Sequence, residues 1–323
     1  MDTAKFYSEI ADGPTQGTAY WVHTDDNVRV RVGTYGTDKV RKGTILLFLG
    51  RFGYIERYGR VAKEFDKHGF ATVVIDWRSQ GLSDRIADDP HTGHVERFSD
   101  YQKDVAAMIK AAEELELPKP WYLVGISMGA CIGLRAMMEG LPVAASALIS
   151  PMFGIKMSTL QRIAAWPLSW AAQKMGKGHI YVPGQSSEIY ILTTPFEKNN
   201  LTHNFDMYDY WVDQARTVPE LQIGGPSLSW LYQGLSECRS LSKMRSPDIP
   251  CITFCGELDE LVDNRAIIDR MERWPNSTFK VIQNAKHDVL TEIPEIGGEV
   301  MNQIVELFSS RALGSVSTAR AIP

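Results

Sequence analysis

The chain has 323 residues, of which 44% are hydrophobic and 23% charged, and its formal net charge at pH 7 is −5. A chain of this kind can bury the core of about one large α/β domain with an insertion, which excludes the disordered and fibrous classes. Acidic and basic residues are interleaved without forming a basic stripe, so we expect no nucleic-acid partner.

The first six residues, MDTAKF, lack the apolar core of a signal peptide, and no stretch approaches the roughly 18 apolar residues that span a bilayer. We therefore expect a soluble, cytoplasmic protein. Four cysteines are too few for a disulfide framework in a chain of this length. They also lack paired C-x-x-C spacing, so we interpret them as reduced core residues and predict neither a metal nor a cofactor at them.

The first 40 residues predict an antiparallel hairpin. Residues 19–22 and the alternating run 28–32 read as its two strands, and the turn residues Asp25-Asp26-Asn27 separate them.

From residue 43 onward, continuous apolar runs alternate with helical patterns. Such runs are typical of strands covered on both faces, so the alternation predicts an α/β fold with a doubly wound, mostly parallel sheet. One helix is indicated by an apolar stripe from Tyr101 to Ala112, which ends at Leu117-Pro118. The predicted strands are residues 45–49, 72–75, 122–124, 147–149, 252–254 and 279–282. Reactive groups in such a sheet are expected at the carboxyl ends of the strands.

The pentapeptide GISMG, residues 125–129, lies between a predicted strand and a predicted helix at residues 130–139. A strand that turns directly into a helix forces its turn residue into a strained conformation and needs glycine on both sides. We therefore interpret Ser127 as a catalytic nucleophile at the carboxyl end of a strand. A structural turn is the alternative.

The alternation breaks between about residues 152 and 240, in a segment that holds four of the eight tryptophans and five prolines. We interpret residues 152–240 as a helical cap, which would roof a substrate pocket. The α/β core would then comprise residues 1–151 and 241–310, with a flexible tail at residues 311–323. Residues 160–174 combine apolar side chains with Arg162 and Lys174. Packing within the cap is the interpretation we favour for them, and peripheral contact with a membrane surface is the alternative.

A serine nucleophile needs a base and a carboxylate that orients the base. Among the seven histidines, His287 follows the predicted strand 279–282 through a short loop, which places it at a carboxyl end. His91 and His94 have the H-x-x-H spacing of a metal site, but no third ligand lies near them in the sequence, so we interpret them as ordinary loop histidines.

The acid is expected in the segment 256–263, where another predicted strand ends. Asp259 is the preferred candidate, and Asp263 is the second, with a helix-capping role as its alternative. Glu257 and Glu260 are less favoured. The order Ser127, Asp259, His287 is the serine, acid, histidine order of the α/β-hydrolase fold.

Acyl transfer also needs two N–H donors for the oxyanion of the tetrahedral intermediate. One is expected from the backbone of Met128, the residue after the nucleophile. The other is expected from the glycine-rich loop 49–53, where we favour the amide of Arg51 over that of Phe52.

Together these segments resemble the lysophospholipase L2-like and monoacylglycerol-lipase-like branch of the α/β-hydrolases over nearly the whole chain. The matching segments are residues 50–51 with 54–58, 76–83, 93–101, the Ser127 elbow and the loops of Asp259 and His287. The chain departs from the family at Leu49, where histidine is usual, and at Ser79, where glycine is usual. The resemblance implies hydrolysis of one acyl ester on a glycerol or glycerophosphate backbone through an acyl-enzyme, without metal or organic cofactor.

Three other functions are compatible with this fold. A short-chain carboxylesterase or an acyltransferase would use the same three residues, and the fold also serves as a non-catalytic scaffold. The intact serine, acid and histidine argue against the scaffold. The sequence predicts neither the head group and acyl-chain length of a substrate nor the oligomeric state.

Overall fold

A nine-stranded sheet with the order β1-β2-β3-β5-β4-β6-β7-β8-β9 runs through the protein, in a computed structural model that describes residues 1–38 and 41–318. Strands β1 to β3 are antiparallel to their neighbours, and β5, β4, β6, β7, β8 and β9 are parallel to one another. The predicted hairpin and mostly parallel sheet are therefore confirmed. The strands are β1 (Asp2–Ala4), β2 (Thr18–His23), β3 (Arg29–Tyr35), β4 (Thr44–Phe48), β5 (Ala71–Asp76), β6 (Trp121–Ile126), β7 (Ala145–Ile149), β8 (Cys251–Gly256) and β9 (Ser277–Ile282).

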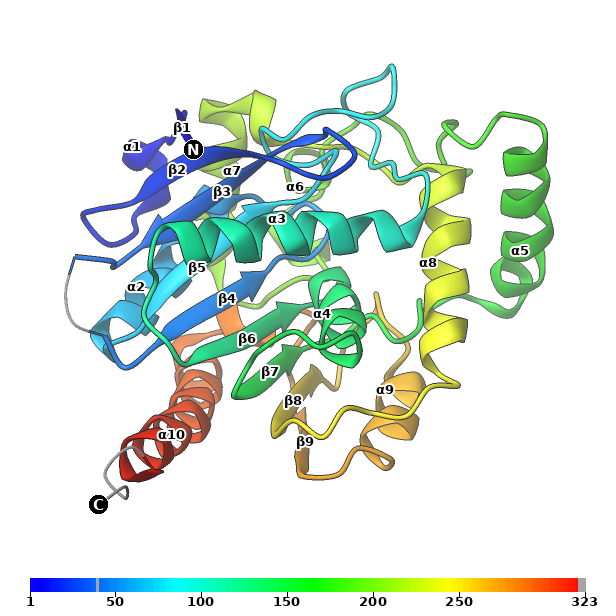
Figure 1. The fold of residues 1–323 in the computed structure, drawn as a ribbon. Helices are drawn as coiled ribbons and strands as arrows, with labels where there is room; N and C mark the ends of the chain where they lie inside the picture. The colour runs from blue at the N-terminus through cyan, green and yellow to red at the C-terminus, as the bar shows by residue number, and fades with distance from the viewer. Residues whose placement is uncertain (39–40, 319–323) are drawn as a thin grey trace.

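Helices cover both faces of this sheet (Figure 1). On β6, Tyr122 stacks on Phe308 of α10 with ring centroids 4.6 Å apart. The next residue, Leu123, faces α4, where its side chain would meet a Cβ added at Gly133. Successive strand residues point to opposite faces, so α4 and α10 cover different sides, as a doubly wound sheet requires. The helices outside the insertion are α1 (Ser8–Ala11), α2 (Gly59–Lys67), α3 (Tyr101–Glu114), α4 (Met128–Met138), α9 (Asn264–Met271) and α10 (Pro294–Thr318).

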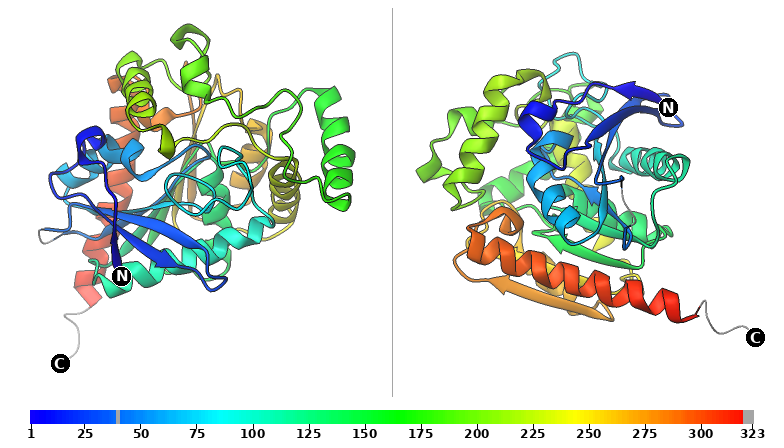
Figure 2. Two further views of the ribbon diagram at one scale, coloured as in Figure 1. Left: turned by 90° about the horizontal axis from the view of Figure 1, so that it is seen from above. Right: turned by 90° about the vertical axis from the view of Figure 1, so that its left-hand side faces the viewer.

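The insertion is the segment between β7 and β8, residues 150–250, and it is largely helical. Its helices are α5 (Thr159–Lys174), α6 (Tyr190–Thr193), α7 (Phe205–Thr217) and α8 (Leu228–Leu241). Helices α5 and α8 pack side by side, with Trp166 edge-on to Tyr232, and they stand on the side to which the arrows of β4 and β6 point (Figures 1 and 2). The division of the chain into a core and a cap stays a prediction.

Part of the segment expected to be a flexible tail is helical, and its flexibility stays a prediction. Helix α10 continues through residue 311 to Thr318, and residues 319–323 lie outside the described residues. The small residues that suggested fraying include alanine and leucine, which are strong helix formers, so the backbone can continue the helix begun at Pro294. Of the helices within residues 1–38 and 41–318, none has the length and apolar character needed to cross a membrane.

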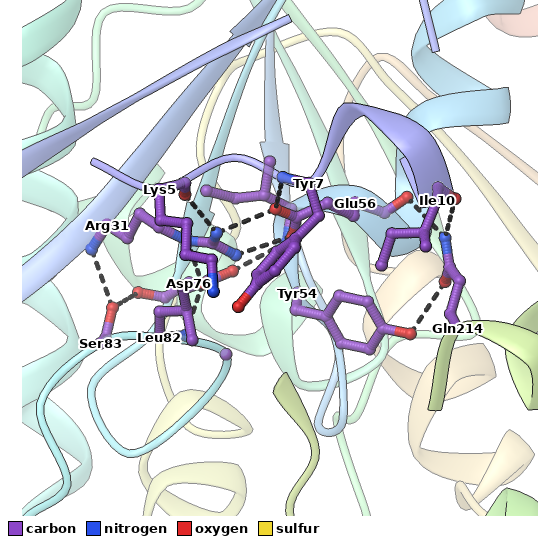
Figure 3. Close-up of polar contacts among 12 residues, drawn as sticks. Lys5, Tyr7, Ile10, Arg31, Tyr54, Glu56, Asp76, Leu82, Ser83 and Gln214 are labelled. Atoms are coloured by element: carbon purple, nitrogen blue, oxygen red, sulfur yellow. Dashed lines mark hydrogen bonds and ion pairs between the residues drawn. The ribbon is translucent and has the colours of Figure 1, made fainter. Parts of the chain in front are cut away.

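A buried ion network joins the N-terminal strands to the loop after β4 (Figure 3). Arg31 of β3 donates to Asp76 at 2.7 Å and to both carboxylate oxygens of Glu56 at 2.9 and 2.7 Å. Asp76 in turn accepts from the backbone amides of Ile55 and Leu82, both at 2.8 Å. All three charged side chains are fully buried. The network therefore fixes the segment around Glu56 at the carboxyl end of β5.

The insertion is tied to the same loop. Tyr54 donates its hydroxyl to Gln214 of α7 at 2.8 Å, and Gln214 donates to the backbone carbonyls of Ile10 and Glu56 (Figure 3). This polar contact is buried, so it holds α7 in one position over the loop that runs from Gly50 to Tyr58.

Candidate active site

Ser127 occupies the turn between β6 and α4 with φ 51° and ψ −115°, a strained conformation for a residue with a side chain. A Cβ at Gly125 would lie 2.7 Å from the Cα of Ala130, and one at Gly129 would lie 2.1 Å from the carbonyl oxygen of Phe48. Positions 125 and 129 must therefore be glycine. The turn has the form that the sequence predicts for a nucleophile elbow.

His287 and Asp259 come together at the carboxyl ends of β9 and β8. The Nδ1 of His287 lies 2.7 Å from Oδ2 of Asp259. The other carboxylate oxygen of Asp259 accepts the backbone amides of Leu261 at 2.8 Å and Val262 at 3.2 Å. Because Nδ1 is engaged by Asp259, the remaining ring nitrogen of His287, Nε2, is free to act on another group.

The other acidic candidates have different partners. Asp263 caps the N-terminus of α9, where it accepts from the amide of Arg265 at 3.1 Å, and this is the alternative role considered for it. Glu257 accepts from the amide of Asn284, and Glu260 pairs with a lysine of the insertion at 2.8 Å. The structure thus places Asp259, and none of these three, against His287.

The electrostatics of the pair favour its charged form. Burial lowers the pKa of His287, but the adjacent carboxylate of Asp259 raises it by more, so the net pKa lies above the ordinary value. Burial raises the pKa of Asp259, and His287 together with two backbone amides lowers it to below the ordinary value. Asp259 is therefore ionised at neutral pH and stabilises a positive charge on His287.

One cavity of about 210 Å³ holds both Ser127 and His287. Its walls are mainly apolar, and the insertion supplies much of them, including Met152, Ile155, Ile191, Leu201 and Trp230. In the part of the chain that the structure describes, no hydrogen bond joins the Ser127 hydroxyl to His287. The two side chains face the same space, and catalytic hydrogen bonds often shorten only when substrate binds.

The two amides expected to hold an oxyanion border this cavity. Within residues 1–38 and 41–318, the backbone N–H groups of Arg51 and Met128 donate to no protein acceptor. The amide of Phe52, the alternative donor, is used by the side chain of Gln80 at 2.9 Å. Of the three candidate donors, Arg51 and Met128 thus have amides without an acceptor among the described residues.

Two further charged side chains in the cavity were not singled out from the sequence. Arg57 lies over the ring of Trp211 at 3.9 Å, and Asp288 is buried beside His287. The sequence placed both near predicted site segments, but it carried no signal that either side chain enters the cavity. His94, by contrast, contacts Ser227 and Glu96 as a loop histidine, and all four cysteines are buried.

Comparison with known proteins identifies a family and several relatives. Residues 39–294 match the family described as serine aminopeptidase, S33 (Hydrolase_4). Lysophospholipase L2 of Escherichia coli K12 is 29% identical over 280 residues, covering 82% of this chain and 80% of its own. Probable lysophospholipase L2 of Haemophilus influenzae is 27% identical over 267 residues, covering 82% and 83%. The structure of a soluble variant of monoglyceride lipase from Saccharomyces cerevisiae, in complex with a substrate analog, superposes with a TM-score of 0.73 at 13% identity, covering 93% and 98%.

Proposed function

Since the chain belongs to the serine aminopeptidase S33 family and has the α/β-hydrolase fold, we propose that it cleaves the carboxylic ester of a monoacyl lipid through an acyl-enzyme. Two bacterial relatives, one named lysophospholipase L2 and the other probable lysophospholipase L2, support an ester-hydrolysing enzyme of this kind. The substrate in this proposal is a lysophospholipid or a monoacylglycerol, because the cavity that contains Ser127 and His287 is mainly apolar and suits a hydrocarbon chain.

The observation that carries the proposal is the Asp259–His287 hydrogen bond in the cavity that contains Ser127. In the proposed mechanism, the Ser127 hydroxyl oxygen attacks the ester carbonyl while Nε2 of His287 takes its proton. The amides of Arg51 and Met128 hold the resulting oxyanion, and Asp259 stabilises the imidazolium. His287 then gives its proton to the leaving alcohol. Water attacks the acyl-enzyme by the same route, which releases the fatty acid and restores Ser127.

Fatty-acid release from a matched panel tests this function. The panel contains a lysophospholipid, a monoacylglycerol and a short-chain aryl ester, each assayed with the wild type and Ser127→Ala. We expect release from a long-chain monoacyl lipid that Ser127→Ala abolishes. Activity confined to the aryl ester would replace the lipid assignment by a short-chain carboxylesterase. Acyl transfer to added glycerol that exceeds hydrolysis would make the enzyme an acyltransferase.

The proposal extends to the way a lipid reaches the cavity. Helix α5 exposes Leu160 (81%), Ile163 (69%) and Trp170 (50%), with Arg162 and Lys174 on the same helix. An apolar face beside cationic side chains suits the surface of an anionic membrane.

Vesicle flotation tests this contact. We expect Ile163→Ala with Trp170→Ala to reduce binding to vesicles that contain phosphatidylglycerol. Phe205→Ala, which removes an exposed ring from α7, is the matched control. Equal binding by wild type and the double variant would exclude α5 as the contact.

A further inference from the structure

The side chain of Arg51 lines the catalytic cavity without an acidic partner. Its Nη1 donates to the backbone carbonyl of Gly224 at 2.9 Å, and this is the hydrogen bond that the guanidinium makes among the described residues. No carboxylate within residues 1–38 and 41–318 forms an ion pair with it. Four of the five N–H donors of Arg51 are therefore left for another acceptor.

Two buried arginines of this chain are neutralised, whereas a third, Arg270, donates to backbone carbonyls and a serine hydroxyl without an acidic partner among the described residues. Arg31 pairs with two carboxylates, and Arg78 pairs with Asp26 and Asp104. A desolvated guanidinium without an anion is costly, and proteins ordinarily supply a partner for it. Burial lowers the pKa of Arg51 to about 9, against a smaller opposing effect of Tyr101. Arg51 therefore remains positively charged at neutral pH, and its charge is uncompensated.

Aromatic rings fix the orientation of this cation. The guanidinium carbon of Arg51 lies 3.7 Å from the ring centroid of Phe52 and 5.6 Å from that of Trp230. Stacking on a ring occupies the face of a guanidinium and leaves its N–H edge available. The fork of donors on that edge matches the oxygens of a phosphate. The guanidinium of Arg51 is thus preorganised to bind an anion.

The Arg51 side chain lies close to the place where the ester would react. Its backbone amide is the proposed oxyanion donor, so its side chain begins beside the ester carbonyl. In a 1-acyl-glycerophosphate the phosphate follows the ester by one short glycerol unit. Arg57 also enters the cavity, but it faces the buried carboxylate of Asp288, whose pKa burial raises and Arg57 lowers in part. Arg51 has no such acid beside it among the described residues that line the cavity.

We infer that the Arg51 guanidinium binds the phosphate of a glycerophosphate head group, so that phosphate-bearing monoacyl lipids are preferred to uncharged monoacylglycerols. This inference rests on the proposed function and names its substrate class. It makes Arg51 a specificity-determining residue through its side chain, in addition to the role proposed for its amide.

The test is a ratio of two kcat/KM values, for 1-oleoyl-glycerol 3-phosphate and for 1-oleoylglycerol. We expect Arg51→Gln to lower this ratio by about 10- to 100-fold, as the loss of a charge-assisted hydrogen bond does. If the substitution only disturbed the loop, kcat/KM would fall by the same factor for both substrates, and their ratio would not change. Arg85→Gln is the control, because Arg85 also donates to a carbonyl of the insertion, that of Glu220, but does not line the cavity.

A second measurement uses the phosphate alone. Glycerol 3-phosphate should inhibit aryl ester hydrolysis by the wild type far better than glycerol does, and Arg51→Lys should keep part of this difference. An unchanged ratio in Arg51→Gln, or equal inhibition by the two compounds, would overturn the inference and leave the proposed function standing. Failure of the wild type to release fatty acid from either lipid would instead refute the proposed function, and the inference with it.

Discussion

Replacing Asp259 by asparagine tests the proposed catalytic arrangement, because it should change which ring nitrogen of His287 carries the proton. One carboxylate oxygen of Asp259 accepts two backbone amides, and the other faces Nδ1 of His287 at 2.7 Å. An asparagine must keep its oxygen toward the two amides, so its NH2 group faces His287. Nδ1 then has to accept a hydrogen bond, which puts the ring proton on Nε2, the atom that should receive the proton of Ser127.

The expected loss is large. In serine proteases the same replacement of the orienting aspartate costs roughly 10⁴-fold in kcat while the geometry persists, and we expect about 10³- to 10⁴-fold here. The pH profile supplies a second readout. His287 works as a neutral base, and the Asp259 carboxylate raises its pKa, whereas burial lowers it. Without the carboxylate the burial effect dominates, so the acidic limb of kcat/KM should move to lower pH.

Stopped-flow or plate assays of ester hydrolysis from pH 5 to 9 measure both effects. Asp263→Asn is the matched control, since that residue caps α9 and makes no contact with His287. It should cost at most about 1 kcal/mol of stability and leave the pH profile in place. Full activity of Asp259→Asn together with an inactive Asp263→Asn would refute the assignment of the acid.

Three further predictions concern the fold around the site. Arg31→Met leaves two buried carboxylates unpaired and should lower the free energy of unfolding by about 3 to 5 kcal/mol in urea titrations; a loss below about 1 kcal/mol would contradict the network. Ser127→Gly should be about 1 kcal/mol more stable than Ser127→Ala in the same titrations, because glycine tolerates the positive φ; equal stability would mean that the turn is not strained. Gly129→Ala should lose both stability and hydrolysis, since its Cβ would lie 2.1 Å from the carbonyl oxygen of Phe48, whereas Gly298→Ala, with no atom within 4 Å, should match the wild type in both assays.

Much of the fold was readable because parallel strands buried on both faces leave long apolar runs. The runs at residues 45–49 and 122–124 correspond to β4 and β6, and the alternating run at 28–32 falls largely within β3. The path of the insertion was not readable, since its helices are positioned by distant polar contacts such as Tyr54 with Gln214.

The candidate site was likewise predictable from the sequence only in part. Ser127, Asp259 and His287 could be proposed because each follows a strand, and the sheet brings carboxyl ends together regardless of the intervening sequence. The side chains of Arg51, Arg57 and Asp288 gave no such signal. Whether a charged side chain enters a cavity or faces water depends on what packs over it, and here the insertion provides that cover.

The most direct test of the central claim is covalent labelling of the nucleophile. The wild type is incubated with a long-chain alkyl fluorophosphonate, and intact-mass and peptide mass spectrometry are run beside the lipid hydrolysis assay. The account predicts one adduct per chain, located on Ser127, formed in step with the loss of fatty-acid release and absent from Ser127→Ala. An adduct on another residue, or full hydrolytic activity in a chain labelled at Ser127, would contradict it.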